Sequence, residues 1–331
     1  MTLAGEAAPM GPIGSYLEEH FRHFNARETV AAARGWDTHL RGGGRMMVTL
    51  AGAMSTAEIG RSLGPMIREG KVHAVTCTAA NLEEDLFNLV AHDDYHVVPN
   101  WRGLSVDDEA QLLAGGFNRV TDTCIPETVM RHLESRLMKL WADAAESSAM
   151  RMPVDFMFDL LDDESLVEHY DVPREHSWVA AAKDAGIPVY TPGFEDSTLG
   201  NIYAARVIDG SVPNHSAYAP GTLQMQRLAD WYTETINSGA SIGFFQVGGG
   251  IAGDFPICVV PMLNQDLRRD VSLWGYFCQI SDAVTSYGGY SGAVPNEKIT
   301  WGKLSPDTPK YMIQSDASIV APLIFAHVMG W

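Results

Sequence analysis

The chain has 331 residues, of which 46% are hydrophobic, so it is long enough to bury a large core as one big domain or two small ones. Its 41 acidic and 23 basic residues give a formal net charge of −18. A surface of that sign repels phosphate backbones and attracts cations, which argues against nucleic acid as a ligand and favours a cationic metabolite. On charge alone, a surface that only keeps the protein in solution is the preferred explanation of the excess acid.

The start, the end and the cysteines of the sequence predict a soluble cytoplasmic protein without a membrane anchor. The first residues, "MTLAGEAAPMGPIGSY", lack the basic and apolar regions of a secretory signal, and the apolar tail "IVAPLIFAHVMGW" is shorter than the roughly 20 residues of a membrane span. The four cysteines are scattered without a CxxC pair, so we expect reduced, mostly buried thiols: Cys77, Cys124, Cys258 and Cys278.

Short apolar runs alternate with amphipathic stretches along the chain. The runs predict strands in the ranges 46–52, 74–80, 188–192, 241–250, 274–281 and 311–318. The amphipathic stretches predict helices in the ranges 56–70, 81–91, 126–146, 177–186 and 221–239. This alternation favours a doubly wound, Rossmann-like α/β fold, in which a mainly parallel sheet carries helices on both faces. We place a helical extension at 1–44 and a single α/β domain at 45–331.

Small or hydroxyl residues follow nearly every predicted strand. Ligands of such sheets bind beyond the carboxyl ends of the strands, where small residues let a nucleotide approach the backbone. The triple glycine in "VGGG" (247–250) is the densest example. It is not a full GxGxxG fingerprint, so a simple tight turn explains it equally well.

Two polar motifs have simpler explanations than a functional site. His92 and His96 in "HDDYH" have a spacing that can bind a metal on a helix, but no third ligand is evident, so we expect no metal. The three acids in "NLEEDLF" (81–87) open a helix, where a solvated N-terminal turn is the default interpretation. The segments 92–125 and 284–310 are the longest irregular regions.

The stretch "NEKITWGK" places Lys303 two residues after Trp301. In an extended segment both side chains point into the same space, and an indole face attracts an alkylammonium ion. A lysine becomes a nucleophile when burial or a nearby cation lowers its pKa. Glu297 is a candidate carboxylate for a bound cation, although a surface lysine is also consistent with the spacing alone.

Five motifs together resemble the deoxyhypusine synthase family in order and spacing: "TAANLEEDL" (78–86), "TPGFEDSTLGN" (191–201), "VGGGI" (247–251), "SGAVPNEKITWGK" (291–303) and "SDASIVAPL" (315–323). The resemblance covers most of the chain from about residue 45 onward. It implies an NAD-dependent aminoalkyl transferase of the deoxyhypusine or homospermidine synthase type. In that family hydride passes from spermidine to the cofactor, a lysine captures the imine, and the aminobutyl group goes to an acceptor amine.

The resemblance implies a role for each matching residue. Lys303 matches the imine-forming lysine, and Trp301 and Glu297 match residues that enclose the polyamine. Glu83 and Glu84 match paired glutamates near the substrate. The residues that fall on NAD-binding segments are Gly52, Ala53, Met54, Ser55, Thr56, Thr78, Ala79, Glu84, Asp196, Gly250, Asp282, Ala283, Asp316 and Ala317, with Asp282 in the place of a hydroxyl residue. The family forms homotetramers with interfacial active sites, so we expect the same here.

Three substrate-side positions depart from the family pattern. Asn201 and Tyr290 stand where the family has aspartates, and Phe255 stands where it has a histidine. Because a buried ammonium without its carboxylate loses several kcal/mol, we expect retained chemistry with a changed donor, such as agmatine or a shorter diamine. The acceptor is a small amine or a protein lysine. Two alternatives stay open: a catalytically decayed NAD-binding assembly subunit, and an amine dehydrogenase without transfer.

Overall fold

The computed structural model describes residues 10–285 and 287–331, and the chain divides into two compact units. Unit 1 comprises Met1–Thr49, Glu69–Ala74 and Ala229–Trp331, and unit 2 comprises Leu50–Arg68 and Val75–Leu228. Compactness therefore groups the N-terminal helices with the C-terminal third of the chain. The predicted boundary between residues 44 and 45 stays a prediction.

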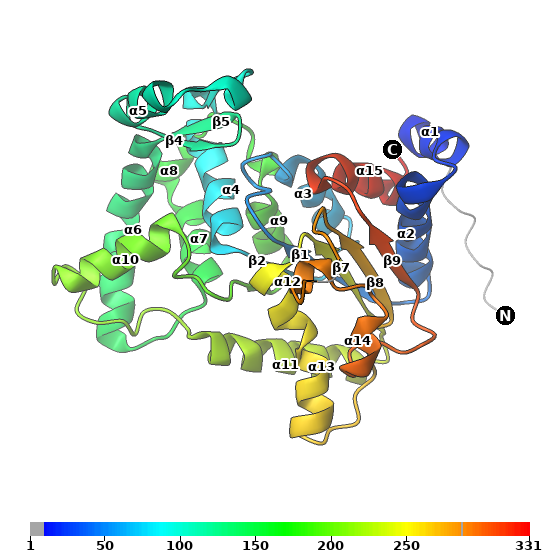
Figure 1. The fold of residues 1–331 in the computed structure, drawn as a ribbon. Helices are drawn as coiled ribbons and strands as arrows, with labels where there is room; N and C mark the ends of the chain where they lie inside the picture. The colour runs from blue at the N-terminus through cyan, green and yellow to red at the C-terminus, as the bar shows by residue number, and fades with distance from the viewer. Residues whose placement is uncertain (1–9, 286) are drawn as a thin grey trace. The chain divides into compact units, whose positions relative to one another are not determined.

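Unit 1 contains parallel strands in the order β1 (Arg45–Leu50), β7 (Ile242–Val247), β8 (Tyr276–Ile280) and β9 (Lys310–Ile313). The last three lie side by side in Figure 1. All residues of β7 and β8 are buried, which explains why their sequences are nearly continuous apolar runs. Because parallel strands end at one edge, the loops that follow β7, β8 and β9 meet there.

Helices cover the sheet of unit 1. The helices α1 (Pro12–His20), α2 (Phe24–Arg41) and α15 (Ala317–Met329) pack together, and the ring centroid of Trp36 on α2 lies 4.7 Å from Phe245 and 5.9 Å from Phe325. The remaining elements surround the loops of the site: α12 (Gly250–Ile257), α13 (Val259–Pro261), the π-helical turn Met262–Asp266, the 3₁₀ turn Tyr290–Gly292 and α14 (Glu297–Thr300).

Unit 2 has the parallel pair β2 (Ala74–Cys77) and β6 (Val189–Tyr190). Its helices are α3 (Gly60–Arg68), α4 (Ala79–Ala91), α5 (Val106–Ala114), α6 (Glu127–Ser147), α7 (Pro153–Asp162), α8 (Glu164–Val167), α9 (Trp178–Ala185) and α10 (Thr198–Ile208). Helix α4 packs against α6, α7, α9 and α10, so it lies inside a layer of helices. Helix α11 (Gly221–Asn237) connects the two parts of the sequence.

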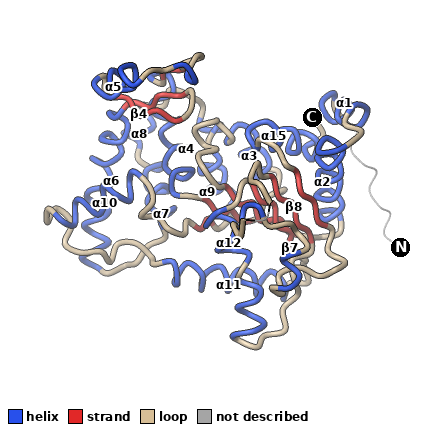
Figure 2. The backbone as a smooth tube through the Cα atoms, in the orientation of Figure 1, coloured by secondary structure: helices blue, strands red, loops and turns tan. Residues whose placement is uncertain are grey.

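The mainly parallel sheet with helices around it confirms the predicted α/β class, and Figure 2 shows the central strands among the helices. All six predicted strands and all five predicted helices are present, with ends that differ by a few residues. The segment 92–125, expected to be irregular, instead holds a small antiparallel sheet: β3 (His96–Val97), β5 (Thr123–Pro126) and β4 (Phe117–Val120). These strands have two to four residues, too few to show a clear period.

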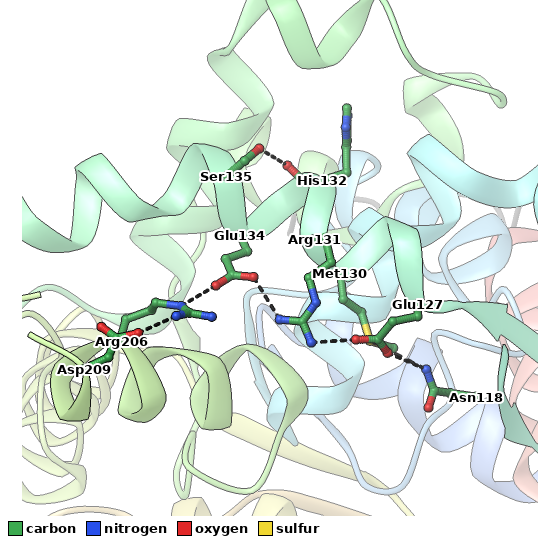
Figure 3. A network of polar contacts seen from close by, with 9 residues as sticks. All are labelled: Asn118, Glu127, Met130, Arg131, His132, Glu134, Ser135, Arg206 and Asp209. Atoms are coloured by element: carbon green, nitrogen blue, oxygen red, sulfur yellow. Dashed lines mark hydrogen bonds and ion pairs between the residues drawn. The ribbon is translucent and has the colours of Figure 1, made fainter. Parts of the chain in front are cut away.

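A network of charged side chains joins α6 to α10 in unit 2. Figure 3 shows Glu134 between Arg131 and Arg206, at N–O distances of 2.9 and 2.6 Å. Burial by itself raises the pKa of Glu134, but the two guanidinium groups outweigh it and hold that pKa below its ordinary value.

We expect Glu134→Ala to lower the melting temperature of the protein by a few degrees, because two guanidinium groups lose a shared, nearly buried partner. Glu127→Ala removes only the exposed end of the same network and is the matched control. Equal melting temperatures for both variants, read by circular dichroism, would contradict a stabilising role for Glu134.

Among the residues that the structure describes, we find no helix with both the length and the apolar character of a transmembrane segment.

Candidate active site

The triple glycine that follows β7 makes a turn that only glycine can form. Gly248 and Gly250 have φ angles of +76° and +56°. The Gly250 N–H donates to the Ser291 hydroxyl at 3.2 Å, and a Cβ on Gly249 would lie 2.0 Å from that oxygen. The turn therefore brings the start of α12 against the 3₁₀ turn that holds Tyr290. A tight turn, one of the two interpretations of this motif, explains the backbone angles of the three glycines.

The side chains of Lys303 and Trp301 lie close together, as the sequence predicted, but the backbone that brings them together is a turn and not an extended segment. The segment is not extended: Trp301 caps α14, and Gly302 has a φ of +67°. This left-handed glycine turns the chain so that Lys303 Nζ lies 5.8 Å from the indole centroid. A Cβ on Gly302 would lie 2.9 Å from Nε2 of Gln265, so the turn is sterically restricted as well.

The Lys303 ammonium lies among the side chains of Asp254, Tyr290 and Trp301 in unit 1. It donates to Oδ1 of Asp254 on α12 at 3.2 Å and lies 5.5 Å from the ring centroid of Tyr290. Lys303 is only 6% exposed, whereas Trp301 is 63% exposed. The Lys303 side chain is therefore nearly buried, while the neighbouring indole of Trp301 is exposed to solvent.

Asp254 also accepts the thiol proton of Cys258, with a sulfur–oxygen distance of 3.6 Å. Burial raises the pKa of that thiol, so it is protonated at neutral pH. Asp254 lies on α12 next to Phe255, whose side chain is half-buried, and Cys258 is the C-cap of the same helix, one turn further on.

Tyr290 is held as a neutral phenol. Its hydroxyl donates to Oε1 of Gln246 at 2.6 Å, and the Gln246 amide donates to the Gly248 carbonyl at 2.9 Å. Burial raises the pKa of Tyr290 well above its ordinary value. The ring is therefore held in a fixed place beside Lys303.

Unit 2 provides a second cluster after β1 and β2. The Thr78 hydroxyl donates to the Gly52 carbonyl at 2.7 Å, and the Asn81 amide donates to the same oxygen at 2.9 Å. The Ser55 N–H donates to Oδ1 of Asn81 at 2.9 Å. Asn81 thus organises the loop 52–56, in which Gly52 has a φ of +62° and faces open space. Ala53 and Met54 are half-buried in this loop, and Ala79 begins α4.

The three acids of α4 are buried, so the expectation of a solvated helix start is wrong. Glu83, Glu84 and Asp85 are 3%, 7% and 3% exposed, because α4 lies among other helices of unit 2. Glu84 accepts the hydroxyl of Thr56. Glu83 accepts the N–H groups of Thr198 and Leu199, at 2.9 and 2.7 Å, at the start of α10.

Asp85 caps the start of α9. Its carboxylate accepts the Ser177 hydroxyl and the N–H groups of Trp178 and Val179, at 3.3 and 3.1 Å. Burial raises the pKa of Asp85 and that of Glu83 to about 7, and it raises the pKa of Glu84 as well, although hydrogen bonds oppose the shift in each case.

The other expected site residues lie at loop ends of their own units. Asn201 on α10 donates to the carbonyls of Glu195 and Ser197, at 3.1 and 2.6 Å, so its amide braces the loop that holds exposed Asp196. In unit 1, Asp282 and Ala283 follow β8, and Asp316 caps α15 by accepting the N–H of Ser318 at 2.8 Å, next to Ala317. Glu297 begins α14 with an exposed side chain.

The structure therefore brings together Lys303, Trp301 and Tyr290 in unit 1, and Gly52–Thr56 with Thr78 and Glu84 in unit 2. The sequence interpretation missed Asp254, Gln246 and Lys298 around the lysine, and Asn81 beside the loop. Lys298 and Asn81 lie inside motifs that were already singled out, and Asp254 lies three residues after the motif "VGGGI". A search for charged and amide side chains in and next to those motifs could have found them.

The histidine pair does not form the helical arrangement that a metal site would need. His92 lies in the 3₁₀ turn His92–Asp94, where Nε2 is 3.3 Å from Oε1 of Glu58, and His96 lies on β3. Within residues 10–285 and 287–331, no three metal-binding side chains form a group.

Fold and site define an α/β protein of the doubly wound class with a candidate active site centred on a nearly buried lysine. The sequence profile of deoxyhypusine synthase matches residues 18–328, and the chain therefore belongs to the deoxyhypusine synthase family.

Named relatives agree with this assignment. A "Deoxyhypusine synthase-like protein" of Cyanothece sp. is 27% identical, over 86% of this chain and 70% of its own. A protein of Archaeoglobus fulgidus named as a candidate deoxyhypusine synthase is 24% identical, over 93% of this chain and 94% of its own. A crystal structure of a candidate deoxyhypusine synthase from Entamoeba histolytica has a TM-score of 0.56 at 14% identity, and covers 95% of this chain and 90% of the other. This likeness supports the shared fold.

Proposed function

We propose that this protein is an NAD-dependent aminoalkyl transferase that oxidises a small cationic amine, captures the resulting imine on Lys303 and transfers the alkyl group to an acceptor amine. Family membership supports a transferase. The observation that carries the proposal is the placement of Lys303: one nearly buried amine, paired with Asp254 and facing two aromatic rings.

Each unit, taken by itself, has residues of the types that fit part of an NAD molecule. In unit 2, Gly52 faces open space at a left-handed turn, and Ser55, Thr56 and Thr78 provide hydroxyl groups beside it. In unit 1, the turn at Gly248–Gly250 and the exposed carboxylates of Asp282 and Asp316 follow the strands. Small residues suit a pyrophosphate, and carboxylates suit ribose hydroxyls. When bound, NAD supplies the hydride acceptor and later the hydride donor.

The chain's own residues position the lysine for imine exchange. Lys303 Nζ must lose its proton before its electron pair forms a bond to the oxidised carbon, and the donor's leaving amine takes up a proton as its carbon–nitrogen bond breaks. Asp254 holds the ammonium in place beforehand, and the rings of Tyr290 and Trp301 shield the nitrogen from water. The acceptor amine then attacks the same carbon and releases Lys303.

Phe255 and Tyr290 suggest a donor of lower charge than spermidine. Aromatic rings suit a flat guanidinium, as in agmatine, or a short diamine such as putrescine. The acceptor in this proposal is a small amine or a protein lysine. We also propose a cytoplasmic homotetramer with active sites at the subunit interfaces, as the family resemblance implies.

The test is incubation with NAD and a panel of putrescine, agmatine and spermidine, with NADH absorbance and product mass read together. The proposal expects a new secondary amine and little accumulated NADH. Free aldehyde with accumulated NADH would instead identify an amine dehydrogenase. Clear preference for spermidine would contradict the proposed donor class, and no reaction with any amine would support a decayed binding subunit.

A further inference from the structure

A second lysine lies beside the first. Lys298 is on α14, five residues before Lys303, and is only 2% exposed. Lysine is among the residues that are almost never fully buried without partners. This ammonium therefore needs an explanation that a helix on the protein surface does not provide.

The chain itself satisfies this buried ammonium. Lys298 Nζ donates to Oε1 of Gln279 and to the carbonyl of Ala293, both at 3.2 Å. It also lies 4.9 Å from the ring centroids of Phe277 and Tyr290, within the range of cation–π attraction. Lys298 is thus a positive charge that is fixed in the interior of unit 1.

The two lysines share Tyr290. Its ring lies 4.9 Å from Lys298 Nζ and 5.5 Å from Lys303 Nζ. The ring is held in place, because it is buried and its hydroxyl donates to Oε1 of Gln246 at 2.6 Å. A further ammonium that approached this ring would meet a like charge in a poorly solvated place.

The ring of Trp301 has Lys303 Nζ beside it, 5.8 Å from its centroid, and most of this side chain stays open to solvent. Trp301 is 63% exposed, and the exposed carboxylate of Glu297 lies on the same short helix. A donor joined to Lys303 therefore lies between Tyr290, which has the additional ammonium of Lys298 beside it, and Trp301, which has Lys303 beside it. The two rings are both aromatic, but they differ in the ammonium groups beside them: Lys298 and Lys303 at Tyr290, and Lys303 at Trp301.

We propose that Lys298 is a specificity-determining residue: its ammonium, built in against Tyr290, disfavours donors that bring an ammonium to that ring and selects donors whose single distal cation lies along Trp301. The favoured class is diamines and guanidino-amines, and the disfavoured class is triamines. This inference rests on the proposed aminoalkyl transfer at Lys303.

The ionisation of Lys298 supports this role. Burial, and then the charge of Lys303, lower the pKa of Lys298 to about 8, while the carboxylates of Glu297 and Asp254 act in the opposite direction. Tyr290, the remaining titratable group that faces it, stays neutral. Lys298 is therefore charged at pH 7 and loses its charge as the pH rises above about 8.

The test compares Lys298→Met, Lys298→Gln and Lys298→Arg with the unmodified protein. Gln keeps a hydrogen-bond donor toward Gln279, Met keeps the length of the side chain, and Arg keeps the charge. For each, kcat/KM is measured with putrescine and with spermidine from the rate at which the secondary-amine product forms, read by mass. Both neutral variants should raise the spermidine-to-putrescine ratio by about tenfold or more, which corresponds to about 1.4 kcal/mol, whereas Arg should leave it low. Melting temperatures check that each variant is folded.

Two further readouts separate this inference from the proposed function. Dissociation constants for spermidine and putrescine, measured by calorimetry with NAD present, give a binding preference between the two amines. This preference can be measured even where no turnover occurs. The ratio in the unmodified protein should also rise between pH 7 and pH 9, but it should rise less in Lys298→Arg, where the charge persists. Unchanged ratios in both neutral variants, or parallel pH profiles, would overturn the role of Lys298. Absent turnover with an altered binding ratio would overturn only the transfer.

Discussion

Lys303→Ala is expected to reduce aminoalkyl transfer by more than about a thousandfold, because the variant lacks the nitrogen that forms the bond to the oxidised donor. NAD binding should persist, since the candidate cofactor residues of both units lie elsewhere in the chain. Borohydride reduction during turnover, followed by mass spectrometry of peptides, should show an alkylated Lys303 in the unmodified protein and none in the variant.

Two variants control this result. Lys303→Arg keeps the charge next to Asp254 but cannot form the imine, so it should be as inactive as the alanine variant. Lys310 on β9 donates to the carbonyls of Pro306 and Thr308 and is not one of the proposed site residues. Lys310→Ala should therefore stay active. Normal transfer by Lys303→Ala would remove Lys303 from the mechanism.

Asp85 is expected to make folding stability fall as the pH rises from 5 to 7. Its pKa is about 7 in the folded chain and 3.8 as the ordinary value, so the folded chain binds more protons than the unfolded chain between these values. The free energy of unfolding then decreases by about 1.4 kcal/mol per pH unit for this one carboxyl. The contribution is fully present below about pH 4 and lost as the pH rises through about 7.

The comparison with Asp85→Asn isolates this effect, because other groups titrate in the same range. Glu83 acts in the same direction, whereas burial lowers the pKa of His73 to about 4 and makes that histidine act in the opposite direction. Urea unfolding of both proteins at pH 5, 6 and 7 gives the difference in free energy of unfolding. That difference should change steadily with pH, and a constant difference would show that Asp85 does not take up a proton on folding.

The sequence determined the types of the main elements and the lysine at the centre of the site. Buried strands need apolar runs and surface helices need a period near 3.6, so all six central strands and the five predicted helices could be located. Lys303, Trp301 and the glycine turn could be found because their motif is local. The antiparallel strands β3, β4 and β5 could not, since such short strands depend on partners that are distant in sequence.

The tertiary structure decided the electrostatics. The acids of α4 have the pattern of a solvated helix start, yet helices packed around α4 bury them and move their pKa values toward 7. Lys298 has the pattern of a surface lysine, yet Gln279, Phe277 and Tyr290 enclose it. The ionisable group of a side chain follows from its residue type, but the free energy of desolvating its charged form depends on which distant residues cover it.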